Sequence, residues 1–370
     1  MNVPELSYIR WAKAHPAASI NLARSGLDAC PPSLLGLRAK DLVTSLPVTN
    51  GYAPLKAAIA QRYGVTPEQV VPLSGGTSFA NWVACAAALD GADRHAEVLV
   101  ERPTYEPLLV TPAAFGHRVR RFDRRFGDGY AIDTDRFLAR VGPRTRLAIV
   151  SNLHNPSGAR IPQATLRAMA AALAAVGGYL LVDEVYLECL FGTRPESGAL
   201  AGPNVIVTNS LTKAYGLDGL RAGWILAPRE VVPSIEKLLD LTINNSVAPG
   251  EQMTLAAFRN LRAIDRRAHG ILDRNLDAVR RFLEREPRLP AVIPDGGNIV
   301  FPRLPRGLDG DRFSTHLLAT YSTLVVPGRF FEAPGHVRFS FGCAPAKLRR
   351  GLENLSRALD DLQRSGPVGT

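Results

Sequence analysis

The feature of this chain that most constrains its fold is a regular alternation between residues 70 and 230. Short runs rich in β-branched residues alternate there with alanine-rich stretches of helical character. Runs such as Leu147–Val150 and Tyr179–Val182 are apolar throughout, which is typical of strands that helices cover on both faces. We therefore expect an α/β fold, with a mainly parallel sheet sandwiched by helices and functional groups at the carboxyl ends of the strands. The expected strands are Val70–Leu73, Glu97–Glu101, Leu147–Ser151, Tyr179–Asp183, Val205–Thr208 and Ala222–Leu226, and the expected helices are Phe79–Leu89, Tyr105–Phe115, Asp133–Val141 and Gln163–Val176.

The two ends of the chain depart from this pattern. Residues 1–45 contain two expected helices and a Pro31-Pro32 turn. After the centre come the helical stretches Val232–Leu241 and Glu251–Arg285, the strand-like segments Asn298–Phe301, Thr323–Val326 and Val337–Phe341, and a final helix, Ala346–Arg364. We expect a smaller α+β domain formed by residues 1–45 and 246–370, beside a large domain of residues 46–245 whose alternative end lies near residue 280.

The composition of the chain limits the number of domains and the classes of partner that we expect. A chain of 370 residues is long enough for about two domains at the usual ~150 residues each. The net charge of +10 comes almost entirely from arginine, and its densest run, residues 117–125, is short and is followed by acidic residues. We interpret this run as solvated surface, with an anion-binding or partner-binding face as the alternative. Nucleic acid is not an expected partner, because such binders concentrate their charge in a patch with interleaved aromatic residues.

The cysteines and the apolar content indicate a cytoplasmic protein. Cys30, Cys85, Cys189 and Cys343 lie far apart and show no metal-ligand spacing, so we expect buried thiols and neither a disulfide nor a metal site. No stretch approaches the ~20 apolar residues of a membrane span. The first residues also lack the apolar core of a secretory signal.

A lysine follows directly on one of the expected strands. Ser210 and Thr212 precede Lys213, and Arg221 follows it eight residues later. A neighbouring arginine disfavours the protonated form of a lysine, and a neutral amine can condense with an aldehyde to form an imine. The two hydroxyls and the guanidinium are the donors that a phosphate dianion requires. The alternative, an ordinary surface loop, is disfavoured by the scarcity of lysine in this chain.

Polar residues also follow two other expected strands. Asp183 ends an apolar strand, where a buried carboxylate needs a partner such as a protonated pyridine nitrogen. Tyr186 lies three residues later, and Asn155 follows the strand that ends at Ser151. Both side chains could contact a phenolic oxygen on the same ring. Each pattern alone is weak, since a strand-ending Asp-Glu also occurs in metal and nucleotide sites and Asn-Pro-Ser-Gly is a common turn.

A glycine-containing turn and a tyrosine complete the candidate set. Gly75, Gly76 and Thr77 lie between a strand and a helix, where a backbone free of side chains can approach an anion at the helix N-terminus. The turn matches neither GxxxxGK[ST] nor GxGxxG, which disfavours nucleotide hydrolases and dinucleotide dehydrogenases. Tyr105 could stack on a flat heterocycle or belong to the core.

Taken in order, these motifs resemble the fold-type I pyridoxal-phosphate enzymes, in particular the class I/II aminotransferases, over roughly residues 20–360. The resemblance implies pyridoxal 5′-phosphate held as an imine on a catalytic Lys213, an amino acid and a 2-oxo acid as substrates, and a homodimer. It implies cofactor contacts for Gly75, Gly76, Thr77, Tyr105, Asn155, Asp183, Tyr186, Ser210, Thr212 and Arg221. It also implies that Arg338 grips the substrate α-carboxylate and that Gly26 lies in a loop that closes over the substrate.

Two departures from the family pattern bear on the substrate and the cofactor. The family often supplies a phosphate-binding tyrosine shortly before a glycine like Gly51, but residues 45–50 contain none, so Thr49 or Asn50 makes this contact or it is missing. Members specific for dicarboxylates carry a second arginine in a segment that resembles Leu241–Ser246, where this chain has no basic residue. A neutral or aromatic amino acid is therefore expected rather than an acidic one.

Other reactions use the same machinery. A β-lyase, decarboxylase or cyclase would share the cofactor site and differ only in the pocket. A non-catalytic regulator that binds pyridoxal phosphate would carry an additional N-terminal DNA-binding domain, for which the residues before the family core leave little room.

Overall fold

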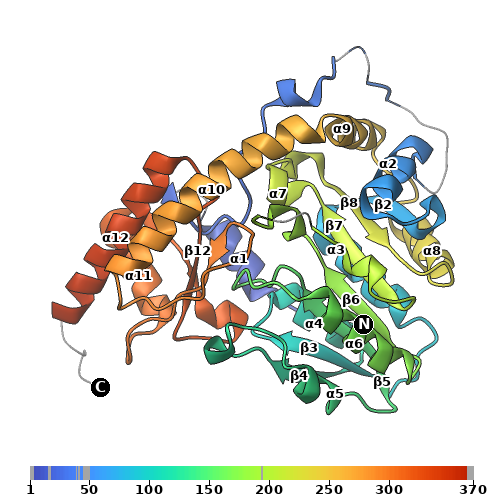
Figure 1. The fold of residues 1–370 in the computed structure, drawn as a ribbon, viewed down its shortest axis with the longest axis horizontal. Coiled ribbons are helices and arrows are strands. Elements are labelled where there is room, and N and C mark those ends of the chain that lie inside the picture. Colours follow the sequence, from blue (N-terminus) through green and yellow to red (C-terminus); the bar gives the residue numbers. More distant parts are fainter. Residues whose placement is uncertain are drawn as a thin grey trace.

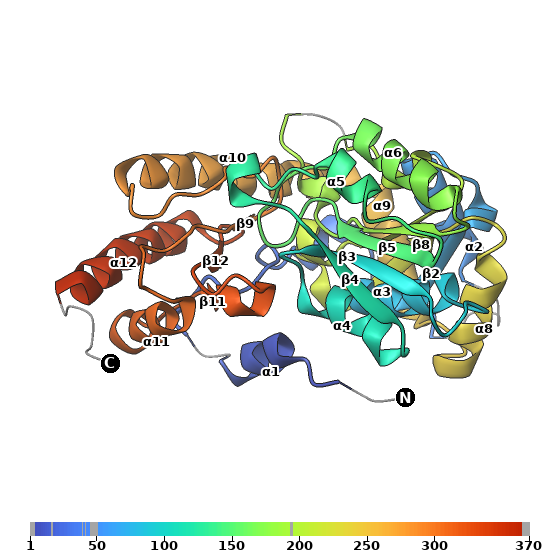
Figure 2. The same ribbon diagram turned by 90° about the horizontal axis from the view of Figure 1, so that it is seen from below.

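A seven-stranded sheet forms the centre of the molecule, and helices cover both of its faces (Figures 1 and 2). The computed structural model describes residues 4–15, 18–38, 40, 42–44, 51–192 and 195–364. The strand order is β2-β8-β7-β6-β5-β3-β4, in which β8 runs antiparallel to both of its neighbours and all other adjacent strands are parallel. The strands are β2 (Val70–Ser74), β3 (Glu97–Arg102), β4 (Arg118–Asp123), β5 (Thr145–Ser151), β6 (Tyr179–Asp183), β7 (Val205–Ser210) and β8 (Ala222–Leu226). The expected α/β fold with a mainly parallel sheet is confirmed.

Successive side chains of the central strands pack into two separate cores. In β5, Leu147 and Ile149 belong to one apolar cluster, whereas Ala148 and Val150 belong to the other. Side chains from helices α3 (Gly76–Ala88), α4 (Glu106–Ala114) and α8 (Val232–Thr242) complete the first cluster, and those from α2 (Ala53–Tyr63), α5 (Thr134–Leu138), α6 (Gln163–Ala174) and α9 (Ala248–Arg259) complete the second. Because both faces are covered, every position of such a strand can be apolar, which explains the uninterrupted runs in the sequence.

The sequence suggested that the basic run at residues 117–125 is solvated surface, and the structure corrects this. Most of it forms the edge strand β4, which pairs with β3. Arg118 and Arg120 form ion pairs with the buried Glu97, and Arg124 is fully buried against Glu101. Three arginines of this run are therefore paired with acidic residues of the neighbouring strand, and Arg121 pairs with Glu332.

The C-terminal part stands beside the end of the large sheet (Figure 1). The stretch expected as one helix over Glu251–Arg285 is two helices, α9 and α10 (Leu261–Arg285), which meet at Asn260. The side chain of Asn260 donates hydrogen bonds to the carbonyls of Leu35 and Ala256, which marks the break. The remaining elements are β9 (Ile299–Val300), α11 (Gly310–Tyr321), β10 (Thr323–Leu324), β11 (Val326–Pro327), β12 (Val337–Ser340) and α12 (Pro345–Arg364).

The N-terminal segment joins this C-terminal part through strand pairing. Strand β1 (Ile20–Asn21) runs parallel to β10, while β11, β12 and β9 form an antiparallel sheet of their own. Of the two helices expected before residue 45, only α1 (Ser7–Ala14) is present among the described residues, followed by a short 3₁₀ turn at Pro32–Leu35. No helix in the described ranges is long and apolar enough to cross a membrane. All four cysteines are buried and unpaired.

Candidate active site

Three adjacent strands, β5, β6 and β7, end at the same edge of the large sheet, and predicted site residues follow each of them. A cavity opens at this edge and brings together residues from six separate regions of the chain. It is lined by Ser25, Thr77, Ser78, Asn81, Tyr105, Leu108, Ser151, Asn155, Asp183, Val185, Tyr186, Thr212, Lys213, Asp218 and Arg221. An adjoining cavity shares Lys213 and Tyr105 and continues toward α1.

Lys213 lies in the short helix α7 (Thr212–Tyr215), directly after β7. Its Nζ donates a hydrogen bond to Oγ of Ser25 at 3.0 Å. Burial is the main cause that lowers the pKa of this amine from 10.5 to about 8, and the positive charge of Arg338 is the second. Arg221, expected from the sequence to be the principal influence, contributes less. The lowered pKa increases the neutral, nucleophilic fraction of the amine near pH 7.

Asp183 is buried at the end of β6 with two hydrogen-bond donors. Nδ2 of Asn81 donates to Oδ2 at 2.7 Å, and the backbone N–H of Val185 donates to Oδ1 at 3.0 Å. Asn81 is itself held by a hydrogen bond from the hydroxyl of Thr208. Burial raises the pKa of Asp183 to about 6 despite these donors. A cationic N–H donor in the cavity would favour the ionised carboxylate.

Three hydroxyl groups near the cavity form a cluster. Oγ1 of Thr77 donates to Oγ of Ser210 at 2.7 Å, and the hydroxyls of Ser210 and Thr212 are also 2.7 Å apart. Thr77 comes from the start of α3, whereas the other two residues flank the end of β7. The predicted phosphate-binding hydroxyls are thus adjacent in space.

Arg221 lies beside this hydroxyl cluster and packs on the glycine turn. Its Nη2 donates to the carbonyl oxygen of Gly75 at 2.6 Å. A Cβ atom at Gly76, whose φ is +72°, would lie 3.3 Å from the same nitrogen, so a side chain there would crowd the guanidinium. The absence of side chains at this turn leaves the helix N-terminus and the guanidinium open to an anion.

Arg338, in β12, is a buried cation with neutral hydrogen-bond partners. Nη1 donates to Oδ1 of Asn155 at 3.0 Å, while Nη2 donates to the hydroxyl of Tyr8 at 2.7 Å and to the carbonyl of Ala23 at 3.3 Å. The side chain is 1% exposed and forms no ion pair with any residue that the structure describes. Because a buried charge is costly without a counter-charge, this guanidinium is suited to an anionic ligand.

The remaining predicted residues surround Lys213. The hydroxyl of Tyr186 donates to the carbonyl of Ser25 at 3.0 Å. A Cβ atom added at Gly26 would lie 3.7 Å from Cδ of Lys213, so this loop packs directly on the lysine. Tyr105 meets the ring of Tyr8 edge-on, with centroids 5.9 Å apart. The expected phosphate contact from Thr49 or Asn50 falls in residues 45–50, which lie outside the described residues.

Tyr8 and Asn81 of the site were not predicted from the sequence, and Ser25 was expected only as a member of the loop that contains Gly26. Tyr8 contacts Arg338, Ser25 accepts from Lys213, and Asn81 donates to Asp183. Asn81 lies four residues after Thr77, one helical turn from the predicted anion-binding turn, so helical spacing is a signal that could have found it. No local signal marks Tyr8, because its partner is more than 300 residues away in the chain.

Comparison with known proteins agrees with this geometry. Residues 11–355 match the family model described as "Aminotransferase class I and II". The chain belongs to this family. It is a pyridoxal 5′-phosphate-dependent aminotransferase of class I/II. The cavity fits the cofactor, because a buried carboxylate, an amine with a lowered pKa and an arginine with neighbouring hydroxyls all line one space.

Individual relatives differ in the reactions that their names state. The chain is 33% identical to a capreomycidine synthase of Streptomyces vinaceus over 93% of this chain and 88% of that protein. It resembles the crystal structure of a PLP-dependent aminotransferase from Streptococcus suis with a TM-score of 0.90 at 26% identity, covering 98% and 99% of the two chains. It also resembles the PLP-dependent cyclase OrfR with a TM-score of 0.88 at 27% identity, covering 98% of each chain.

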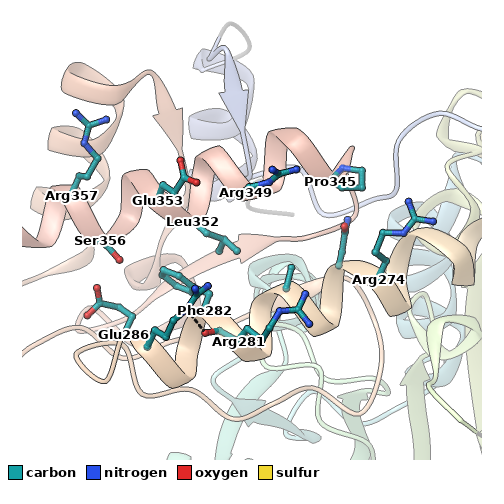
Figure 3. Close-up of a pocket in the computed structure, with 13 residues that line it drawn as sticks. Arg274, Arg281, Phe282, Glu286, Pro345, Arg349, Leu352, Glu353, Ser356 and Arg357 are labelled. Carbon is teal, nitrogen blue, oxygen red and sulfur yellow. Dashed lines mark hydrogen bonds between the residues drawn. The ribbon is translucent and has the colours of Figure 1, made fainter.

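A larger cavity lies elsewhere and contains none of the predicted site residues. It has a volume of about 800 Å³, against about 170 Å³ for the cavity at Lys213. Figure 3 shows it between α10 and α12, with Phe282 and Leu352 between the two helices and several arginines around them. It lies in the C-terminal part, away from the ends of the large-sheet strands, so cavity size alone does not locate the chemistry of this aminotransferase.

Proposed function

We propose that this enzyme moves an amino group between an L-amino acid, neutral or aromatic rather than acidic, and a 2-oxo acid. The observation that carries the proposal is the buried guanidinium of Arg338, which has no counter-charge among the described residues and lowers the pKa of Lys213. An α-carboxylate at Arg338 would bring the substrate α-carbon toward this amine.

Each predicted residue has a distinct role in the proposal. When bound, pyridoxal 5′-phosphate supplies an aldehyde and an electron sink. Lys213 would hold it covalently, and Nζ of Lys213, once free, would remove the proton from the substrate α-carbon. Asp183 would keep the ring nitrogen protonated. Asn155 and Tyr186 would contact the ring oxygen, and Tyr105 would stack on the ring.

The phosphate would be held at the opposite end of the cavity. Its ligands would be the hydroxyls of Thr77, Ser210 and Thr212, the Arg221 guanidinium and the glycine turn. These donors belong to three segments that the sheet brings together, so the phosphate would anchor the ring while the substrate exchanges.

We assign the adjoining cavity that continues toward α1 to the substrate and call it the substrate cavity. Its walls support a neutral or aromatic side chain. Ile9 and Trp11 of α1 line it together with Leu324. Arg24 also lines this cavity, but its guanidinium lies 3.3 Å from the carboxylate of Asp218. An acidic substrate side chain would therefore compete with Asp218 for its counter-charge.

Two measurements test this function. Borohydride reduction followed by peptide mass spectrometry should fix the cofactor to Lys213, and a Lys213→Ala variant should retain none. Single amino acids added to the holoenzyme should bleach the visible absorption of the cofactor–lysine linkage, with neutral or aromatic ones faster than aspartate and glutamate. Absence of this band from the purified holoenzyme, or fixation at another lysine, would refute the proposal.

A cyclase is the second candidate, favoured by the similarity to the capreomycidine synthase and to the cyclase OrfR. The two functions differ in their need for an acceptor. An aminotransferase consumes a 2-oxo acid for each amino acid turned over. Steady loss of an amino acid without an added 2-oxo acid would favour the cyclase or another reaction of this family.

We also propose a cytoplasmic homodimer. Leu241 and Val247 are 83% and 58% exposed, and the backbone N–H of Val247 donates to Ser74 beside the glycine turn. A second subunit would cover these side chains close to the cofactor phosphate. The buried, unpaired cysteines suit a reducing compartment.

The domain division expected from the sequence also stays as a proposal. We place a large cofactor-binding domain at residues 46–245 and a smaller domain at residues 246–370 with residues 1–45. The pairing of β1 with β10 supports the assignment of the N-terminal segment, because it joins that segment to the C-terminal part.

A further inference from the structure

A buried ion pair lies behind the cofactor cavity, with no direct contact to Lys213. Nη1 of Arg124 is 2.8 Å from Oε2 of Glu101, and both side chains are fully inaccessible to solvent. Nε of Arg124 donates to the carbonyl of Tyr130 at 2.6 Å, whereas its Nη2 has no hydrogen-bond partner. A buried pair of this kind contributes little net stability relative to apolar residues. Its position therefore suggests a role beyond packing.

The second oxygen of Glu101 fixes the hydroxyl of Ser151 at the end of β5. Oε1 accepts hydrogen bonds from the backbone N–H of Ser151 at 2.7 Å and from its Oγ at 2.6 Å. Because the hydroxyl hydrogen is directed at the carboxylate, the lone pairs of Oγ face elsewhere. One of them accepts a hydrogen bond from the backbone N–H of Asn155 at 3.0 Å.

Asn155 carries this chain of hydrogen bonds into the active site. Its Oδ1 accepts from Nη1 of Arg338, so its Nδ2 group is directed away from the arginine. Asn155 also lines the cavity next to Asp183, whose pKa is raised further by the negative charge of Glu101. A continuous buried path thus runs from Arg124 through Glu101, Ser151 and Asn155 to Arg338.

We propose that Glu101 and Ser151 are positioning residues, which hold Asn155 and through it orient Arg338 toward the substrate carboxylate. The inference rests on the proposed function, because it assigns Asn155 to the cofactor ring oxygen. The carboxylate sets the direction of the serine hydroxyl, the hydroxyl sets the backbone position of Asn155, and the Asn155 amide sets the angle of the guanidinium.

Ser151→Ala tests this path with the smallest perturbation. It removes the hydroxyl and leaves the ion pair of Glu101 with Arg124 intact. Ser314→Ala is the matched control, because Ser314 is also buried and its hydroxyl donates to the carbonyl of Val325 in the C-terminal part. Both holoenzymes are compared with the unmodified one in melting temperature, in kinetics and in the pH titration of the visible absorption band.

Ser151→Ala should raise the titration midpoint by roughly half a pH unit or more, as expected from weakening one neutral hydrogen bond of about 1 kcal/mol. A weaker donor at the ring oxygen leaves more negative charge there, which retains the neighbouring proton. The KM for the amino acid should rise about threefold to tenfold on the same basis. Ser314→Ala should change neither quantity.

A double-mutant cycle identifies the route of the effect. In an Asn155→Ala background, Ser151→Ala should produce no further shift of the midpoint, because the side chain through which it acts is gone. An equal shift in both backgrounds, an unchanged midpoint in a folded Ser151→Ala protein, or an equal shift in Ser314→Ala would each overturn the positioning role. Absence of the visible band from the unmodified holoenzyme would instead refute the proposed function itself.

Discussion

Replacing Arg338 with lysine should separate carboxylate recognition from simple electrostatics. Lysine keeps the positive charge near Lys213 but lacks the planar fork that can bind both oxygens of a carboxylate. In the structure, one guanidinium nitrogen of Arg338 donates to Asn155 and the other to Tyr8. These two hydrogen bonds fix the orientation and the position of the guanidinium. An ammonium group cannot satisfy these two partners and a bidentate carboxylate together.

The size of the effect follows from the donors that are lost. A hydrogen bond to a charged group contributes about 1.5–3 kcal/mol, and Arg338→Lys removes at least one such bond to the carboxylate. The value of kcat/KM for the best amino acid should therefore fall about 10- to 150-fold. Most of the loss should appear in KM, because the carboxylate is bound in the ground state as well as in the transition state.

A single-turnover assay measures this directly by following the loss of the visible absorption band after mixing with the amino acid. The matched control is Arg329→Lys, an exposed arginine of the same part of the molecule that pairs with Asp311. The corresponding amine, which lacks the α-carboxylate, should react equally slowly with the unmodified enzyme and with Arg338→Lys. An unchanged KM for the amino acid, or an equal loss with the amine, would refute the assignment of Arg338.

Three further results are expected. The rate at which cofactor-free protein binds pyridoxal 5′-phosphate should rise with pH and reach half of its maximum near pH 8, because only the neutral amine of Lys213 reacts and its pKa is lowered to about 8. A midpoint near the ordinary lysine pKa of 10.5 in stopped-flow absorption would contradict this. Gly216→Ala should destabilise the protein by at least about 2 kcal/mol in calorimetry, because φ at Gly216 is +67° and an added Cβ would lie 2.3 Å from the carbonyl oxygen of Asp28. Gly219→Ala is the control and should have little effect, because an added Cβ there would meet open space. Leu241→Glu should shift sedimentation toward the monomer because it places a charge on a side chain that is 83% exposed; an unchanged sedimentation coefficient would place the dimer interface elsewhere.

The parts of the fold that could be predicted are those whose signal is local. The strands β6 and β8 begin and end where the sequence placed them, because each is an apolar run with a change of composition at either side. The strand β4 was missed because an edge strand can carry charged side chains when its neighbour supplies carboxylates, as Glu97 does. The division between α9 and α10 was missed because the contact that accompanies it, from Asn260 to Leu35, joins residues more than 200 positions apart.

In the candidate site, too, the sequence predicted residues with a local signal and missed contacts between distant segments. Lys213, Asp183 and Asn155 could be identified because each lies at the end of a strand or in the loop just after it, and the ends of parallel strands meet at one edge of the sheet. The hydrogen bonds from Arg338 to Tyr8 and from Lys213 to Ser25 could not be derived, since they join segments separated by most of the chain. The influence of Arg338 on Lys213 has the same origin, and for this reason Arg221 was overrated from the sequence.

The attachment of α1 has a practical consequence for recombinant work. Backbone N–H groups of Ser7 and Tyr8 and the hydroxyl of Ser7 all donate to the single carboxylate of Glu106, and the helix that begins there forms one wall of the substrate cavity. An affinity tag fused before this helix would lie next to that wall and next to the contacts of Ser7 and Tyr8 with Glu106. A tag placed after α12 would not adjoin this wall. We therefore expect a KM measured with a C-terminal tag to be the same as that of the untagged enzyme.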